Sequence, residues 1–164
     1  MTKFPVTTVG HSALERELRH RIRVERPRLI ESVQQAIADD SNLAENSAYQ
    51  AAKTDQEMNE TRIVELEDIL ARAEVIDISK LSGDMVKFGA TVTLTDADTN
   101  ETKVWQIVGQ PEANANEGKV SVTSPLARAL IGMTKGATVE VQTPVGTKVY
   151  KVRKIEWLVD VAQK

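Results

Sequence analysis

The spacing of apolar residues divides the chain into a helical part and a strand-rich part. Through the first 73 residues, apolar side chains recur three, four or seven positions apart, which places them along one face of a helix. In the first arm they are Leu14, Leu18, Ile22, Leu29, Ile30, Val33 and Ile37. In the second arm they are Ala48, Ala51, Ala52, Met58, Leu66, Ile69, Leu70 and Ala73. Two such arms joined by a short polar link are expected to pack as an antiparallel helical hairpin.

The predicted hairpin is long, thin and interrupted. Arms of about 27 residues would each extend on the order of 40 Å at 1.5 Å per residue, so the outer end cannot pack against a small second domain. Near the link the seam consists of alanines, which lets the backbones approach closely. Pro27 lacks an amide hydrogen, and we expect it to bend or interrupt the first arm.

After residue 78, glycine and proline become frequent and the apolar spacing changes to alternation. Turn-forming residues at 96–100 and 144–146 separate alternating segments as in β-hairpins. The predicted strands are 90–95, 102–109, 119–122, 137–143 and 147–158. The second part of the chain is therefore expected to form an antiparallel sheet.

One short helix interrupts this succession of strands. Ser124 is a favoured N-cap residue, Pro125 suits the first helical position, and Gly132 would end the helix. The sequence thus predicts an α+β protein of two domains. Residues 1–77 would form the hairpin, and residues 78–164 a globular domain with a sheet and a short helix.

Composition excludes several classes of protein. The 164 residues carry a formal net charge of −3, which argues against a protein that coats duplex DNA by bulk electrostatics. Cysteine is absent, which excludes disulfides, thiolate zinc sites and cysteine nucleophiles. No apolar run reaches the roughly 18 residues that span a membrane, and no signal peptide is recognisable. We therefore expect a soluble, cytoplasmic protein with no membrane contact. Separately, we expect it to be a monomer.

Five blocks of sequence at characteristic relative spacing follow the predicted hairpin. They are AEVID (73–77), VKFGATVTL (86–94), WQIVG (105–109), VSVTSPLARALIG (120–132) and VYKVRKIEWL (149–158). Together with the hairpin, they resemble the GreA/GreB family of bacterial transcription elongation factors over nearly the whole chain. The resemblance implies an N-terminal coiled coil and a C-terminal domain of FKBP-like fold. It also implies bacterial RNA polymerase as the partner, with the coiled coil in the secondary channel and the C-terminal domain at the channel rim.

The resemblance also implies a chemical role for the hairpin tip, at about residues 39–46. In the family, the tip brings acidic side chains beside the catalytic Mg²⁺ of the polymerase, which then cleaves the 3′ end of its own backtracked nascent RNA. The factor would therefore not be an independent nuclease, and would bind no cofactor alone. The family tip usually reads G-D-L-x-E-N-x-E-Y, whereas residues 41–49 read SNLAENSAY. Glu45, Asn46 and Tyr49 match, while Asn42 replaces an aspartate and Ala48 replaces a glutamate.

The missing aspartate leaves the strength of this chemistry open. Asparagine offers an oxygen but no charge, and one charge pair at about 4 Å is worth roughly 4 kcal/mol at an effective dielectric of 20. Glu45 is then the expected ligand of the shared Mg²⁺, and Asn42 could offer the ion only an uncharged oxygen. Asp39 or Asp40 could compensate, or both could simply solvate and cap the end of the helix.

Other positions receive roles by the same resemblance. Tyr49 and Lys53 are candidate contacts to the RNA, since a lysine just past the tip could hold a phosphate as a point charge, although it could equally serve solubility. The candidate polymerase-docking residues are Ser124, Pro125, Arg128 and Gly132.

Three functions remain to be compared. We predict a cleavage factor that releases arrested elongation complexes through the polymerase. The alternative is a channel-binding regulator or inhibitor with little cleavage activity, because Asn42 replaces the tip aspartate. A prolyl isomerase or chaperone is the third, but its pocket would need clustered aromatic residues, and few are present. Fold alone does not confer that function.

Several other side chains have a structural and a functional interpretation. The tryptophans Trp105 and Trp157 are expected in the core of the second domain rather than on RNA. A run of arginines could be ion-paired or could contact nucleic acid or an acidic polymerase surface; its members are Arg16, Arg19, Arg21, Arg23, Arg26 and Arg28.

Overall fold

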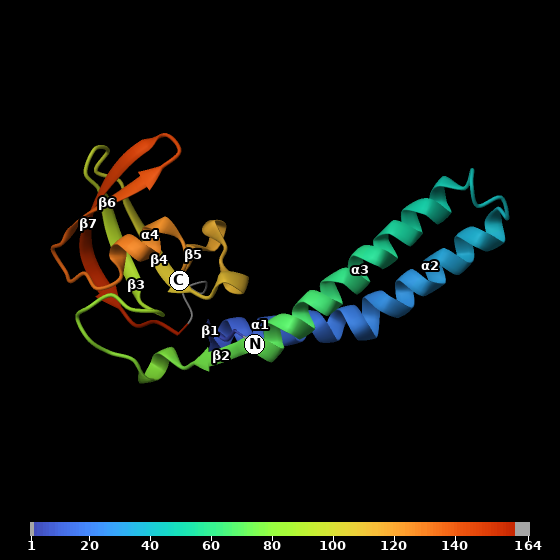
Figure 1. The fold of residues 1–164 in the computed structure, drawn as a ribbon, viewed down its shortest axis with the longest axis horizontal. Coiled ribbons are helices and arrows are strands. Elements are labelled where there is room, and N and C mark those ends of the chain that lie inside the picture. The colour runs from blue at the N-terminus through green and yellow to red at the C-terminus, as the bar shows by residue number, and fades with distance from the viewer. Residues whose placement is uncertain (1, 160–164) are drawn as a thin grey trace. The chain divides into compact units, whose positions relative to one another are not determined.

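A computed structural model of the protein describes residues 2–159, which form two compact units (Figure 1). One unit is helical and comprises Ser12–Arg72. The other contains the sheet and comprises the chain up to His11 together with the chain from Ala73 onward. The predicted α+β fold in two parts is confirmed, but the N-terminal residues belong to the sheet-containing unit, which differs from the predicted division at residue 78. Among the described residues, no helix combines the length and apolarity that a membrane span requires.

The first arm of the hairpin consists of two helices with a π-helical segment between them. Helix α1 covers Thr8–His20, the π segment Arg21–Glu25, and α2 Arg26–Asp39. Pro27 lies in the first turn of α2, so the predicted interruption by this proline is confirmed. Because Pro27 has no N–H to donate, a wider turn accommodates it, and the N–H of Arg26 bonds to the carbonyl of Arg21, five residues earlier.

Helix α3, Ser47–Arg72, forms the second arm and runs beside α2 (Figure 1). The predicted seam is correct for Leu14, Leu29 and Leu66, which are 6%, 4% and 0% exposed. It is wrong for five residues that are exposed: Ile30, Ile37, Ala48, Ala51 and Met58. The buried residues of α2 and α3 that the predicted stripe did not include are Ala36, Asn59 and Ile63. Ile30, Ile37 and Met58 each lie one position from a buried residue, and one position turns a side chain by about 100° around the helix.

Polar groups cross the seam near the π segment. The buried side chain of Asn59 donates to the carbonyl of Arg21 at 3.2 Å and accepts from its guanidinium at 3.1 Å. Arg26 makes two hydrogen bonds to the Glu60 carboxylate, and Arg28 pairs with Glu25. The ion-paired interpretation of the arginine run is therefore confirmed for Arg21, Arg26 and Arg28, whereas the remaining three are exposed: Arg16, Arg19 and Arg23.

Acid is expected to weaken this hairpin through Glu17. Arg62, and to a lesser degree Arg21, bond to the Glu17 carboxylate and lower its pKa from 4.5 to about 2. Because the folded-state pKa is the lower one, the pairing stabilises the hairpin fully above pH 4.5 and is lost as the pH falls toward 2. Glu17 is about one-third exposed, so water screens the pair and we expect a contribution of about 1 kcal/mol. Thermal unfolding followed by circular dichroism should show Glu17→Gln losing this part of the pH dependence.

A matched control for this prediction is Glu57→Gln, which removes an exposed carboxylate from the same unit. Its unfolding midpoint should follow that of the parent at every pH. Parallel curves for Glu17→Gln and the parent would contradict the assignment.

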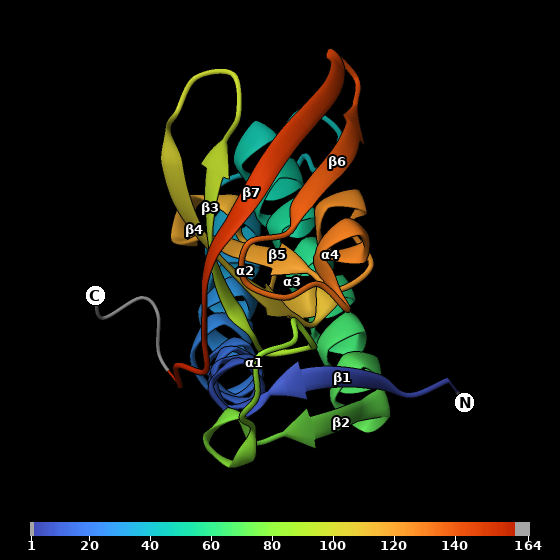
Figure 2. The same ribbon diagram turned by 90° about the vertical axis from the view of Figure 1, so that its left-hand side faces the viewer.

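The sheet-containing unit is built on five strands in the order β5-β4-β3-β7-β6 (Figure 2). Their bounds are β3 Thr91–Asp96, β4 Thr102–Val108, β5 Lys119–Ser121, β6 Thr138–Thr143 and β7 Gly146–Glu156. All neighbours are antiparallel except β4 and β5, which are parallel. The predicted strands are thus found, and the antiparallel expectation fails only for the short β5.

Helix α4, Pro125–Leu130, packs against this sheet. The core contains nine fully buried residues: Val86, Ala90, Val92, Leu94, Ile107, Ala127, Leu130, Val139 and Val152. Trp105 and Trp157 pack against it, as predicted. Trp157 also donates its indole N–H to the carbonyl of Gly83 at 3.0 Å. Helix α4 is held against the sheet because its residues Ala127 and Leu130 are part of this buried core.

A second, two-stranded sheet brings the N-terminus into this unit, a feature that the sequence did not reveal. Strand β1, Phe4–Thr7, pairs in parallel with β2, Ala73–Ile76 (Figure 2). The Glu112 carboxylate accepts from the backbone N–H groups of Thr7 and Gly109, each at 2.8 Å, and from the Thr7 hydroxyl. A Cβ at Gly109 would lie 2.2 Å from the carbonyl oxygen of Pro5, so only glycine allows this close approach.

Candidate functional site

The link between α2 and α3 forms a compact turn that exposes its polar side chains. Asp40 ends α2 in an extended conformation, and its carboxylate accepts a hydrogen bond from the backbone N–H of Asn42 at 3.0 Å. The N–H of Glu45 then donates to the carbonyl of Asn42 at 3.2 Å. Between Asp40 and Glu45 every residue is exposed. The link therefore presents its carboxylates to whatever surrounds it.

Asn42 and Glu45, two of the candidate residues of the turn, lie together. The Asn42 side-chain amide donates to one carboxylate oxygen of Glu45 at 3.3 Å. This places a neutral hydrogen-bond donor beside the Glu45 carboxylate. Glu45 is thus oriented by a hydrogen bond rather than repelled by a like charge.

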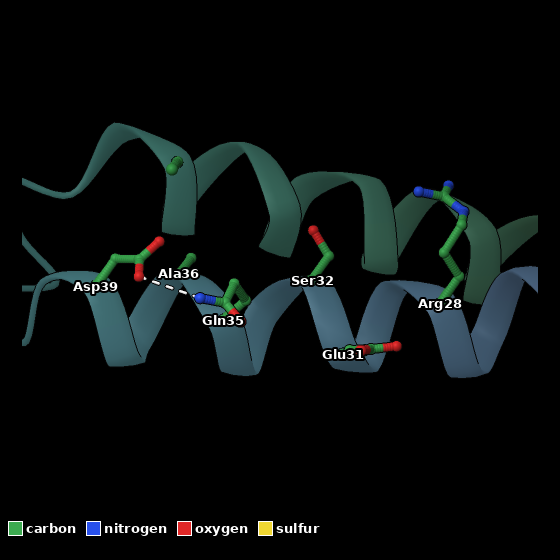
Figure 3. Close-up of a pocket in the computed structure, with 7 residues that line it drawn as sticks. Arg28, Glu31, Ser32, Gln35, Ala36 and Asp39 are labelled. Atoms are coloured by element: carbon green, nitrogen blue, oxygen red, sulfur yellow. Dashed lines mark hydrogen bonds between the residues drawn. The ribbon is translucent and has the colours of Figure 1, made fainter.

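Asp40 and Asp39 are less well placed to replace the missing carboxylate. The carboxylate of Asp40 is occupied by the N–H of Asn42, the turn-capping arrangement considered as its simpler role. Asp39 accepts from the side chain of Gln35 at 3.1 Å, one turn back along α2 (Figure 3). Within residues 2–159, no three His, Asp or Glu side chains form a group that could hold a metal ion.

A shallow groove of about 420 Å³ borders the site along the hairpin (Figure 3). Its lining mixes both charges with small residues: Arg28, Glu31, Ser32, Gln35, Ala36, Asp39 and Ala48. Ala36 is buried in the seam, which keeps this end of the hairpin thin. The groove contains no concentrated charge, so the exposed turn remains the chemically distinctive feature.

The two candidate RNA contacts lie on α3 just beyond the turn. Tyr49 and Lys53 are four residues apart, so they share one face of the helix. Tyr49 is half-buried, while Lys53 is exposed and its amine is 3.4 Å from the side-chain oxygen of Gln56. This single weak contact leaves the Lys53 ammonium available to an anion.

Two residues that the sequence reasoning gave no role hold the turn in place. The Gln50 side chain donates to the carbonyls of Leu43 and Ala44, at 3.4 and 3.0 Å. Asn46 is buried and bonds to both arms. An asparagine directly before a helix is a common N-cap, and that signal could have identified Asn46 from the sequence.

The candidate docking residues lie on α4 or directly beside its ends, in the sheet-containing unit. The Ser124 hydroxyl accepts from the N–H of Ala127 at 3.1 Å, which confirms the predicted N-cap. Pro125 begins the helix, Arg128 is exposed on it, and Gly132 follows it with φ of +92°.

Exposed apolar residues that the sequence reasoning missed adjoin this helix. Their segments are connected, since Val86 N–H donates to the Met133 carbonyl at 2.8 Å and Gly132 N–H donates to the Val86 carbonyl at 2.9 Å. The exposed side chains are Met85, Ile131 and Met133, at 46%, 38% and 38%. Arg128 thus stands near apolar surface, a combination typical of protein–protein contacts.

Comparisons with known proteins agree over almost the whole chain. Residues 4–75 match the family described as "Transcription elongation factor, N-terminal", and residues 81–157 match "Transcription elongation factor, GreA/GreB, C-term". "Transcription elongation factor GreA" of Nitrobacter hamburgensis is 59% identical over 155 residues, which cover 94% of this chain and 98% of the relative. The protein of the same name from Rhodopseudomonas palustris is 57% identical over 157 residues, which cover 96% and 98%.

A solved structure is also similar in sequence. It is that of "GreA factor homolog 1 (Gfh1)" of Thermus thermophilus, which is 29% identical and matches 94% of this chain and 99% of its own, with a TM-score of 0.42. Both family matches together span nearly all the described residues. The chain belongs to the GreA/GreB family of transcription elongation factors.

Proposed function

We propose that the protein binds bacterial RNA polymerase and stimulates cleavage of the 3′ end of backtracked nascent RNA, which releases arrested elongation complexes. The nuclease activity belongs to the polymerase, and this chain supplies a carboxylate from the turn between α2 and α3. The observation that carries the proposal is the exposure of Glu45 at the end of a thin helical hairpin, in a chain of this family. The sheet-containing unit supplies the docking surface around α4.

The residues of the turn suit a metal ion shared with the polymerase rather than one held by this chain alone. Magnesium is commonly bound through only one or two carboxylates, with phosphates and waters as the other ligands. Glu45 offers one such carboxylate, and the Asn42 side chain orients it. When bound, the ion supplies charge stabilisation and an activated water for attack on a phosphodiester.

The direct test uses an elongation complex of the cognate polymerase that has been walked into a backtracked position with labelled RNA. Addition of the full-length protein should shorten the RNA from its 3′ end and restore elongation on supply of nucleotides. The protein incubated with the same RNA and Mg²⁺ but without polymerase should leave the RNA intact. Cleavage at the intrinsic rate of the polymerase, at saturating protein, would contradict the proposal.

Docking through α4 gives a separate prediction. Arg128→Ala should raise the concentration of protein needed for half-maximal cleavage by about 5-fold or more, because arginine is enriched among the interface residues whose truncation costs more than about 1 kcal/mol. The rate at saturation should not change, since the hairpin is untouched. Lys103→Ala removes an exposed cation on β4 of the same unit and should leave the concentration dependence unaltered. Equal curves for Arg128→Ala and the parent would exclude Arg128 from docking.

A further inference from the structure

Asn46 connects the end of α2 to the start of α3 through a single side chain. Its amide nitrogen donates to the carbonyl of Ala36 at 2.8 Å and to the carbonyl of Asp40 at 2.9 Å. Its amide oxygen accepts from the backbone N–H of Tyr49 at 2.9 Å. The residue is 6% exposed, although the residues on both sides of it are exposed.

These bonds join the end of α2 to the beginning of α3. The first N–H groups of α3, that of Tyr49 included, have no acceptor within their own helix. The Ala36 carbonyl already accepts from the backbone N–H of Asp40 at 3.2 Å, so Asn46 adds a second bond to it. The orientation of the amide is determined, because backbone carbonyls can only accept and the Tyr49 N–H can only donate. Only an amide of this length can satisfy two acceptors and one donor together. An aspartate in its place would retain the N-cap of α3 but could donate to neither carbonyl, and a serine, with one hydroxyl hydrogen, could donate to at most one of them.

Asn46 bonds to residues at both ends of the functional turn. The turn begins at Asp40, whose carboxylate accepts from the N–H of Asn42 and whose carbonyl accepts from Asn46. It ends at Glu45, the residue directly before Asn46. Fixing the carbonyl of Asp40 and the N–H of Tyr49 therefore fixes both ends of the segment that holds the Asn42–Glu45 pair.

We propose that Asn46 is the positioning residue of the site: by joining the two helix ends, it holds the Glu45 carboxylate in one direction. Its effect on the turn is a property of the free protein, whereas its effect on cleavage rests on the proposed function. Positioning matters for such chemistry because a displacement of about 1 Å can cost on the order of 100-fold in rate.

The first test measures the turn itself and needs no polymerase. The chain contains no cysteine, so nitroxide labels can be placed through cysteines introduced at the exposed positions Ala44, in the turn, and Gln34, on α2. The distance distribution between the labels should be narrow in the otherwise unaltered protein. It should broaden with Asn46→Ser and with Asn46→Asp, which is close to isosteric.

Asn59→Ser is the matched control. Asn59 is the other buried asparagine of the helical unit, and it too bonds across the seam, but its partner is Arg21 and not the turn. This variant should leave the label distances unchanged. Unaltered distributions in both Asn46 variants, with helical circular dichroism retained, would overturn the proposal, as would equal broadening in Asn59→Ser.

The second test measures cleavage by the unlabelled variants on the backtracked complex. Asn46→Ser should lower the rate at saturating protein by at least about 10-fold, with the half-saturating concentration unchanged, and Asn59→Ser should match the parent. A parent that stimulates no cleavage would contradict the proposed function, while the label distances still decide the role of Asn46 in the turn. A parent-like saturated rate for Asn46→Ser would overturn its role in positioning Glu45 for the reaction.

Discussion

Glu45→Gln is expected to reduce the stimulated cleavage rate by on the order of 100-fold or more, because it removes the single charged group at a family position of the turn. The substitution keeps the size and most of the hydrogen-bonding capacity of the side chain. What it removes is one charge beside a divalent ion, and a charge pair at about 4 Å is worth up to roughly 4 kcal/mol at an effective dielectric of 20. The rate should be measured at saturating protein over a range of Mg²⁺ concentrations.

The control for this prediction is Glu31→Gln. Glu31 lies on α2 in the lining of the adjoining groove (Figure 3), so the change in net charge of the hairpin is the same. Its cleavage rate should equal that of the parent, and both variants should bind polymerase with unaltered affinity. If Glu45→Gln also cleaves at the parent rate, the carboxylate mechanism does not operate in this protein.

Asn42→Asp is expected to increase the cleavage rate by about 10-fold at limiting Mg²⁺, because it restores the second carboxylate and strengthens recruitment of the ion. In the free protein the same change replaces a hydrogen bond to Glu45 by like charges at close distance, which disfavours ionisation of both groups. The gain should therefore grow with pH in the acidic range. A Mg²⁺ titration at two pH values measures both effects.

Asn42→Ala distinguishes the effect of the missing charge at this position from the effect of the hydrogen bond to Glu45. It removes the hydrogen bond to Glu45 without adding charge, so it should give no gain at any Mg²⁺ concentration. A gain of equal size in both variants would show that the asparagine merely restrains Glu45. If the parent does not cleave and Asn42→Asp does not restore cleavage, the protein acts in the channel as a regulator.

Local signals in the sequence were sufficient for some elements. Ser124 and Pro125 predicted the start of α4, because the N-cap and first-turn preferences depend on immediate neighbours. Pro27 predicted the interruption of the first arm for the same reason. The position of Glu45 in an exposed turn followed from the polar link between two apolar stripes.

Other features depend on contacts that no local pattern encodes. Apolar spacing does not distinguish Ile30 from its buried neighbour Leu29. More than one face of the helix agrees with the spacing, and the contacts with the second arm decide which face is buried. The pairing of β1 with β2 joins segments at opposite ends of the hairpin sequence. The bonds of Asn46 to Ala36 and Asp40 likewise require the final backbone geometry.

The parallel pairing of β1 with β2, and the bonds from Glu112 to Thr7, also determine when the protein can finish folding during synthesis. The residues of β1 are synthesised before their partners, which lie in Ala73–Ile76 and at Glu112. The helical hairpin has its contacts within Ser12–Arg72 and can form as soon as that segment emerges. Contacts between residues distant in sequence form late, because the chain must lose the entropy of closing a long loop before these contacts contribute favourable free energy. The first strand therefore remains an unpaired edge until Ala73–Ile76 have been synthesised, and its bonds to Glu112 form later still. During that interval chaperones and proteases can reach it.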